Sequence, residues 1–411
     1  MMSKEKRRVP KLRFPGFTED WEQCKLSVLA TMNARIGWQN LRTSEFLDNG
    51  DYLLITGTDF DNGRIKYSTC HYVEKKRFDQ DTKIQLSTGS ILITKDGTLG
   101  KVALVEELPK PATLNAGVFN VRVKDDAFLS YKYLYHYLKA PFLMKYVTAN
   151  ATGGTIKHLN QSILVDFPIP ITGKQEQDRI AKLLDSLESI ITLHQRKLNN
   201  LKLKKKALLQ KLFPKNEERY PELRFPGFTD AWEQRKLGSL ATVEMNKRIF
   251  KEQTTIKGDI PFYKIGTFGS DADSFISREL FKEYKNKYPY PNIGDILISA
   301  SGSIGRTVVY NGEDAYYQDS NIVWLNHNGK IDNSFLLQFY NQVKWAGLEG
   351  STIKRLYNKN ILETNIALPK IEEQRLIGKF FELVDRSITL HQRKLDHLQL
   401  QKKALLQQMF V

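Results

Sequence analysis

Cysteine is almost absent from this sequence. Its 411 residues include two cysteines, Cys24 and Cys70, and neither belongs to a C-x-x-C pair or a cluster with histidine. Disulfide scaffolds and structural zinc sites both require several such residues at fixed spacings. The sequence therefore argues against both kinds of site, and it is typical of a protein from a reducing compartment.

Long hydrophobic runs are also missing. A membrane helix needs roughly 18 or more consecutive apolar residues, and no stretch of this chain approaches that length. The basic start MMSKEKRRVPKLRF is followed by no apolar segment of the kind found in a signal peptide. We therefore expect a cytoplasmic protein without a membrane partner.

Signatures of catalysis are missing as well. The chain has no Pro-Pro pair, which the adenine methyltransferase signature requires, and it has no G-x-S-x-G motif. The stretch KDGTLGK is not a phosphate-binding loop, because Lys95 and Val102 stand where that motif needs a glycine and a hydroxyl residue. We expect a protein that is not an enzyme.

Positive charge is abundant. The 62 Lys and Arg residues outnumber the 46 Asp and Glu residues, which gives a net charge of +16 and a pI near 9.5. Each phosphate that a protein cation neutralises releases condensed counterions, so such an excess favours a polyanionic partner. Nucleic acid is the leading candidate for that partner.

The chain is internally duplicated. The stretch LRFPGFT occurs at Leu12–Thr18 and again at Leu223–Thr229, and the 21-residue segments around the two copies agree at 15 positions. The segment ITLHQRKLNNLKLKKKALLQKLF from Ile191 agrees with ITLHQRKLDHLQLQKKALLQQMF from Ile388 at 17 of 23 positions. Solenoid repeats have periods of about 20–50 residues, so this much longer period indicates two domains, each followed by a connector.

The segments between the shared ends have diverged and read as mixed structure. GDILISASGSIGRTVVY from Gly294 has short β-branched runs separated by glycine turns, which is typical of strands and hairpins. FLSYKYLYHYLKAPFLMKYV has aromatic residues at helical spacing, at Tyr131, Tyr135 and Phe142 with Leu138. We expect this stripe to pack in a core and not to stack on bases.

The connectors carry heptad repeats. Steps of four and three residues trace an a/d seam along each connector, with His194, Lys205, His391 and Lys402 as its polar members. These four residues are candidates for fixing the helix register. The apolar seam residues of this prediction are Ile180, Leu184, Leu187, Ile191, Leu198, Leu201, Ile377, Phe381, Val384, Ile388, Leu395 and Leu398.

Two helices with the same pattern are most simply satisfied by pairing with each other. The sequence thus predicts an α+β protein in which two globular domains are joined and separated by two long antiparallel coiled-coil helices, with a pseudo-twofold internal repeat. The expected ranges are 1–172 for the first domain, 173–213 for the central helix, 214–369 for the second domain and 370–411 for the C-terminal helix.

Each half also places cations in loops rich in glycine and serine. Small residues let the backbone approach a phosphate, and a nearby cation or hydroxyl can then reach phosphates or base edges. The candidate DNA-binding residues are Lys95, Lys101, Thr155, Lys157, His158, Ser301, Arg306, Thr352, Lys354 and Arg355.

Taken together, these motifs resemble the specificity subunits of Type I restriction-modification systems along essentially the whole chain. The resemblance rests on the repeated LRFPGFT with its WEQ and KL, on the repeated ITLHQRKL with KKALLQ, and on the GDILIS-x-x-G-x-x-G hairpin at Gly294. It also rests on DFPIPITGKQEQDRIAKLLD from Asp166 and IALPKIEEQRLIGKFFELVD from Ile366. The first hairpin departs from the pattern, with Ser90 where the second has Asp295.

The resemblance implies a non-catalytic subunit whose two target-recognition domains each read one half of a split, asymmetric DNA sequence. The paired helices would set the spacer and dock two methyltransferase subunits, and the repeated LRFPGFT would present the same surface to each. S-adenosylmethionine would then bind to the methyltransferase, and ATP and magnesium to the restriction and translocation subunits. No cofactor is expected in this chain.

An alternative interpretation is a coiled-coil scaffold that assembles another enzyme without reading DNA. The net charge of +16 and the size of the divergent segments argue against it.

Overall fold

The computed structural model describes residues 9–150, 158–215, 218–347 and 355–410. It contains two compact units. The first unit combines Met1–His194 with Lys394–Val411, and the second is Gln195–Arg393. The boundary between the units therefore falls within both long helices, so each unit owns part of each helix.

The first unit is built on a four-stranded antiparallel sheet in the order β2-β10-β7-β8. A three-stranded sheet, β6-β3-β9, packs against one face of the four-stranded sheet, and its strands β3 and β9 are parallel. The strands of the two sheets are β2 (Ala30–Ala34), β3 (Tyr52–Ile55), β6 (His71–Val73), β7 (Ile91–Thr94), β8 (Val102–Leu104), β9 (Ala112–Leu114) and β10 (Val118–Val123).

Shorter elements complete the first unit. The remaining strands are β1 (Glu22–Lys25), which pairs with β11 (Pro168–Ile171), and the small hairpin of β4 (Phe60–Asp61) and β5 (Arg64–Ile65). Its short helices are α1 (Leu26–Leu29), α2 (Lys75–Phe78), α3 (Tyr131–Lys139), α4 (Phe142–Asn150) and α5 (Gln161–Leu164).

The second unit repeats this topology. Its four-stranded sheet has the order β13-β19-β16-β17, its three-stranded sheet the order β15-β14-β18, and β12 pairs with β20. The strands are β12 (Glu233–Lys236), β13 (Thr242–Glu244), β14 (Ile260–Tyr263), β15 (Phe275–Ile276), β16 (Ile296–Ser299), β17 (Thr307–Val309), β18 (Tyr316–Tyr317), β19 (Ile322–Asn326) and β20 (Asn365–Leu368). The helices are α7 (Arg278–Lys287), α8 (Asn333–Tyr340) and α9 (Asn358–Glu363). The α+β class expected from the sequence is confirmed in both units.

The aromatic stripe, which runs from α3 to the start of α4, lies in the core of the first unit. The side chains of Tyr135 and Leu138 are buried, and Tyr131 and Phe142 are half-buried against the same cluster. Burying an aromatic side chain removes a large apolar area from water, which explains why this surface faces inward. The expectation that the stripe packs and does not stack on bases is confirmed.

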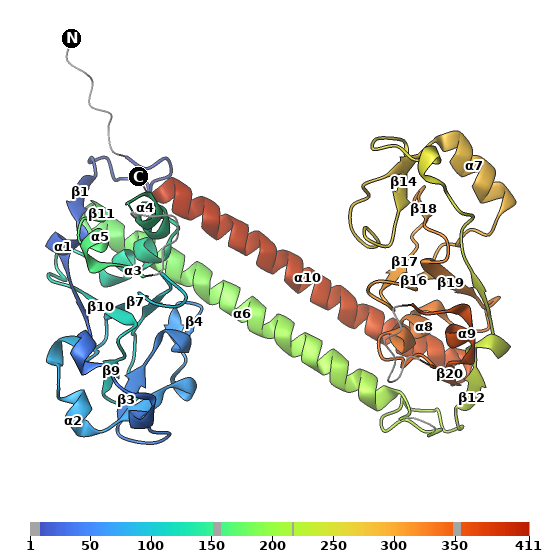
Figure 1. Cartoon of the computed structure of the whole chain (residues 1–411), viewed down its shortest axis with the longest axis horizontal. Coiled ribbons are helices and arrows are strands. Elements are labelled where there is room, and N and C mark those ends of the chain that lie inside the picture. Colours follow the sequence, from blue (N-terminus) through green and yellow to red (C-terminus); the bar gives the residue numbers. More distant parts are fainter. Residues whose placement is uncertain (1–8, 151–157, 216–217, 348–354, 411) are drawn as a thin grey trace, which may run out of the picture. The chain divides into compact units, whose positions relative to one another are not determined.

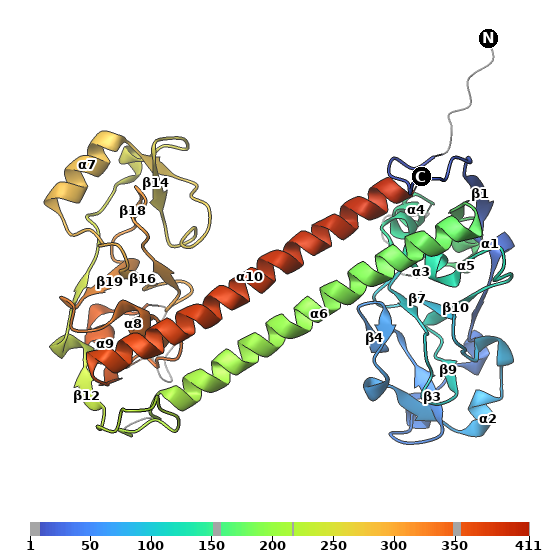
Figure 2. The same ribbon diagram turned by 180° about the vertical axis from the view of Figure 1, so that it is seen from behind.

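The two connectors form the long helices α6 (Lys174–Leu212) and α10 (Ile371–Met409), each of 39 residues and each unbroken (Figures 1 and 2). In the first unit, Glu188 of α6 bonds to Lys402 of α10. In the second unit, Lys205 Nζ lies 2.7 Å from an oxygen of Asp385. A higher residue number on α6 meets a lower one on α10, so these contacts are antiparallel.

The apolar seam positions lie on the inner side of these helices. Ile191, Leu201, Val384 and Ile388 are half-buried, and the other eight are buried: Ile180, Leu184, Leu187, Leu198, Ile377, Phe381, Leu395 and Leu398. Lys205 and Lys402, the two lysines of the seam, each form an ion pair with a carboxylate on the opposite helix.

Each LRFPGFT copy fastens the end of one long helix to the start of the other. In the first unit, the Leu12 amide donates to the Gln408 carbonyl, 2.9 Å away, and Arg13 donates to both oxygens of Glu176 at 2.8 and 2.9 Å. Glu176 is buried near the start of α6. A bidentate bond of this kind fixes the orientation of both groups.

The second copy makes the same contacts. The Leu223 amide donates to the carbonyl of Lys211, near the end of α6, at 2.8 Å. Arg224 donates to both oxygens of the buried Glu373, each at 2.8 Å. The motif is thus repeated because both units need the same clasp between their helix ends.

A buried polar cluster distinguishes the first unit. His136 Nε2 and Lys132 Nζ each lie 2.8 Å from Asp185, and Lys139 Nζ lies 2.9 Å from Glu188. Burial opposes ionisation of Asp185, but bonds to His136 and Lys132 outweigh it and lower its pKa to about 2. Burial likewise opposes ionisation of Glu188, yet the charges of Lys139 and Lys402 lower its pKa to about 2.

Acid is therefore expected to destabilise the first unit. The folded-state pKa values of Asp185 and Glu188, about 2, lie below the usual values near 4. Their contribution to stability is complete above about pH 5 and is lost as the pH falls toward 2. Urea unfolding of the purified chain across this range should show the loss, and the double variant Asp185→Asn/Glu188→Gln should show much less of it. An unchanged acid dependence in that variant would contradict the assignment.

In the part of the chain that the structure describes, no helix is both long enough and apolar enough to cross a membrane.

Candidate nucleic-acid interface

Three loops that are distant in the sequence meet at one end of the four-stranded sheet in the first unit. They follow β7, precede β10 and precede α5. The Leu159 amide donates to the Lys95 carbonyl at 2.9 Å, and the Lys95 amide donates to the Gly117 carbonyl at 2.9 Å. Backbone bonds thus fix the three loops against one another independently of their side chains.

The second unit has the same arrangement. The Leu356 amide donates to the Ala300 carbonyl, and the Ala300 amide donates to the Asn321 carbonyl, both at 2.7 Å. His158 of the first unit therefore corresponds to Arg355 of the second. Asp96 corresponds in the same way to Ser301.

A hydroxyl group pins each glycine loop. In the first unit, the Lys101 amide donates to Thr94 Oγ1 at 2.9 Å, and in the second the Arg306 amide donates to Ser299 Oγ at 2.9 Å. Both loops turn through two glycines with positive φ, Gly97 and Gly100 in one and Gly302 and Gly305 in the other. A side chain would strain these positions, which explains the shared G-x-x-G spacing.

The candidate residues of the first unit lie around this junction. His158 is exposed, and its Nδ1 lies 2.5 Å from Asp96 Oδ1. Lys101 is exposed, whereas Lys95 is half-buried with its ammonium 5.6 Å from the centre of the Phe119 ring. The structure therefore places Lys95 and His158 at the same junction.

The candidates of the second unit are held more tightly. Arg355 Nη2 donates to the Ser320 carbonyl at 2.9 Å, and Ser301 Oγ donates to Asn321 Oδ1 at 2.8 Å. Arg306 is exposed, but its Nη1 donates to the Phe268 carbonyl at 2.8 Å. The remaining candidates, Thr155, Lys157, Thr352 and Lys354, lie outside the described residues.

Sequence reasoning missed one pair of arginines. The stretch MNARI from Met32 matches MNKRI from Met245, so Arg35 and Arg248 share a short motif after β2 and β13. Because the strand pairings make Asn33 the counterpart of Glu244, Arg248 lies two residues further along the chain than the counterpart of Arg35. Arg35 is buried, whereas the Arg248 side chain is 60% exposed beside the three-loop junction. The short internal match was a usable signal, although it does not reveal that the two copies differ in exposure.

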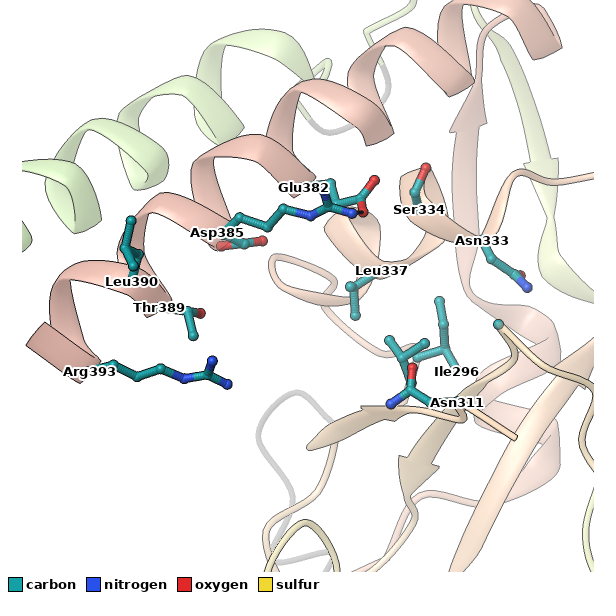
Figure 3. Close-up of a pocket in the computed structure, with 13 residues that line it drawn as sticks. Ile296, Asn311, Asn333, Ser334, Leu337, Glu382, Asp385, Thr389, Leu390 and Arg393 are labelled. Carbon is teal, nitrogen blue, oxygen red and sulfur yellow. Dashed lines mark hydrogen bonds and ion pairs between the residues drawn. The ribbon is translucent and has the colours of Figure 1, made fainter. Parts of the chain in front are cut away.

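A groove of about 1080 Å³ lies in the second unit. Figure 3 shows side chains of α8, such as Ser334 and Leu337, facing the groove together with side chains of α10. The amides of Ser130 and Asp332, at the starts of α3 and α8, each donate to a glutamine side chain, and this shared bond aligns the two helices. In that alignment, Lys132 and Tyr135 of α3 correspond to Ser334 and Leu337 of α8. In the first unit the larger side chains join the polar cluster around Asp185 and Glu188.

A family model described as the Type I restriction modification DNA specificity domain matches residues 18–203 and 229–400. The chain belongs to this family. As a Type I specificity subunit it is the non-catalytic, DNA-recognising component of a restriction-modification system. The interpretation from its repeated motifs is confirmed at this level.

Two curated relatives illustrate the range of similarity to this specificity subunit. A putative type I restriction enzyme specificity subunit of Haemophilus influenzae is 42% identical over 269 residues, which are 64% of this chain and 66% of that relative. The putative MjaX specificity subunit of Methanocaldococcus jannaschii is 23% identical over 94% of this chain and 92% of its own length.

Solved structures share the fold of this specificity subunit. The S subunit of a Type I system from M. genitalium has a TM-score of 0.65 at 18% identity, covering 98% of this chain and 99% of that one. A chain from a study of complex assembly and conformational transition in a type I system has a TM-score of 0.52 at 17% identity, covering 98% and 99%.

Among the residues that the structure describes, no group of three His, Cys, Asp or Glu side chains is placed to hold a metal ion.

Proposed function

We propose that each unit of this specificity subunit reads one half of a bipartite, asymmetric sequence in double-stranded DNA, and that α6 and α10 set the spacer. One observation carries the proposal: the two units share the backbone bonds of the three-loop junction and differ in the side chains it presents. Phosphate contacts position a protein on DNA, whereas base contacts specify the sequence. Two junctions with the same backbone bonds and different side chains can therefore sit on DNA in the same way and read different half-sites.

The candidate residues in these loops remain proposed DNA contacts, including Thr155, Lys157, Thr352 and Lys354. The chain itself would need no cofactor. S-adenosylmethionine would bind to the methyltransferase subunits, and ATP and magnesium to the restriction subunits of the full complex. We place this assembly in the cytoplasm, where it meets the DNA.

The test is to co-express the chain with the methyltransferase subunit of its system in a host that lacks adenine methylation, and to map N6-methyladenine along the genome. We expect one split, asymmetric motif modified on both strands. A stable complex that methylates no sequence, and does not bind DNA, would overturn the proposal.

The long helices are also proposed to dock two methyltransferase subunits. These helices carry exposed leucines at matched positions: Leu193 and Leu203 on α6 are 65% and 66% exposed, and Leu390 and Leu400 on α10 are 67% and 65% exposed. Large apolar side chains that are repeated on a surface are typical of protein contacts. Two copies of this pattern suit two copies of one partner.

Glutamate substitution of these leucines is expected to remove the methyltransferase copies one at a time. Leu193→Glu or Leu390→Glu alone should each weaken one copy, and the double variant should weaken both, because a charge would be buried at the contact. Native mass spectrometry of the complex gives the stoichiometry. The control Lys197→Glu changes charge at an exposed non-leucine position on α6; equal losses with this control would argue against docking through the leucines.

A further inference from the structure

The loop before β19 holds two arginines that come from different parts of the second unit. Asp319 of this loop binds Arg248, with 2.8 Å between Oδ2 and Nε. The next residue, Ser320, accepts a 2.9 Å bond from Arg355 Nη2 through its carbonyl. The loop is itself tied to the glycine turn, because the Ala300 amide donates to the Asn321 carbonyl. Both guanidinium groups therefore lie beside the three-loop junction.

The contact with Asp319 orients Arg248 and still leaves part of its guanidinium group available for other contacts. Its side chain is 60% exposed, whereas the Asp319 carboxylate beneath it is only 16% exposed. Within the described residues, Arg248 is bonded through Nε, which leaves its two terminal nitrogens to donate to another molecule. A guanidinium fixed at Nε loses less freedom when it binds, because its orientation is already set.

The arginine of the matching MNARI motif in the first unit has the opposite arrangement. Arg35 is 2% exposed, and it donates through Nε to the Leu114 carbonyl at 2.8 Å and through Nη2 to Thr113 Oγ1 at 3.2 Å. Its charge supports the segment before β10 from inside the unit. The arginine of this short motif thus has a structural role in one half and faces solvent in the other.

The backbone of the loop is strained at its centre. Ser320 has a φ of 53°, in the left-handed region that favours glycine, and it lies between Asp319 and Asn321. Strained residues persist where the surrounding structure holds them, and they concentrate at functional sites. Here the strained residue supplies the carbonyl that orients Arg355, while its neighbour orients Arg248.

We propose that Arg248, oriented by Asp319, is a specificity-determining residue that reads a guanine in the half-site of the second unit. The inference rests on the proposed DNA-reading function. The two terminal nitrogens of a guanidinium match O6 and N7 of guanine in the major groove, a pairing that a lysine cannot reproduce with the same geometry. Asp319 is a positioning residue, because it acts on the base only through Arg248.

The burial of Arg35 has a consequence for the other half-site. In the first unit the arginine of the MNARI motif is buried, and the junction carries the His158–Asp96 pair. We therefore expect substitutions at Arg248 to alter only one half of the motif.

The experiment compares methylation motifs of complexes formed by the methyltransferase subunit with the full-length chain and its variants. Wild-type methylation gives both half-sites and tests the proposed function by itself. Arg248→Ala and Arg248→Lys should each lower the preference for one guanine about 10- to 100-fold and leave the other half-site unchanged. Asp319→Asn should relax the same base position to a smaller extent.

The control is a second exposed arginine–aspartate pair, Arg278 with Asp314, whose Nη1 and Oδ2 lie 3.2 Å apart. Arg278→Ala should leave the motif unchanged. An unchanged motif in the Arg248 variants would overturn the inference, as would a uniform loss of methylation with Arg248→Ala that Arg248→Lys restores, because that pattern indicates a phosphate contact. Absence of methylation with the wild-type chain would instead overturn the proposed function, and this inference with it.

Discussion

Replacing Glu188 by alanine is expected to lower the unfolding free energy of the chain by about 3–5 kcal/mol, the usual loss when one partner of a buried ion pair is removed. Glu188 lies on α6 and binds Lys139 of α3 at 2.9 Å and Lys402 of α10. Without this carboxylate, the two cations would face each other in a poorly hydrated site. Burial already lowers the pKa of Lys139, and the charge of Lys402 lowers it further.

The internal repeat supplies a matched control for this experiment. Asp385 stands at the corresponding position of α10 and binds Lys205 at 2.7 Å, but its side chain is 36% exposed. Asp385→Ala should therefore cost only about 0.2–1 kcal/mol. Urea unfolding of the purified variants measures both values. Equal losses would show that the buried cluster does not add to the stability of the first unit.

Replacing Arg224 by alanine is expected to have a comparable effect, about 3–5 kcal/mol. The substitution leaves the carboxylate of Glu373 buried without the two bonds that Arg224 donates, each 2.8 Å long. Arg13→Ala should cost less, because Thr172 Oγ1 also donates to the equivalent Glu176. The residue that matches Thr172 before Glu373 is Pro369, which has no donor.

A double variant separates the ion pair from the packing of the clasp. Arg224→Met with Glu373→Met removes both charges and keeps apolar bulk, so it should recover most of the stability that Arg224→Ala loses. Chemical unfolding provides the comparison. If the double variant were as unstable as Arg224→Ala, the loss would come from the shape of the clasp and not from an unpaired carboxylate.

The periodic parts of the fold were predictable from the sequence. Heptad spacing extends through α6 and α10 because a helix in a paired bundle needs an apolar residue at each turn of its inner face. The glycine turns after β7 and β16 were also visible, since positive φ values favour glycine. The helical spacing of Tyr135 and Leu138 correctly indicated a core face.

The candidate site was harder to predict from the sequence, because it is built by contacts between distant segments. Nothing local to Lys95, Gly117 and Leu159 indicates that their backbones bond to one another. Arg35 and Arg248 share a local motif yet differ in exposure, since burial depends on what packs around each position. For the same reason, the sequence did not indicate that Arg13 binds Glu176.

The discontinuity of the first unit has a consequence for synthesis on the ribosome. Its core includes Leu406, Met409 and Phe410 packed with Ile180 and Leu184, so the unit lacks part of its interior until these residues have been translated. The second unit is one contiguous stretch, and domains generally fold as units while the chain grows. The half that leaves the ribosome first is therefore the half whose folding finishes last, and its incomplete core is the surface that a chaperone would need to shield.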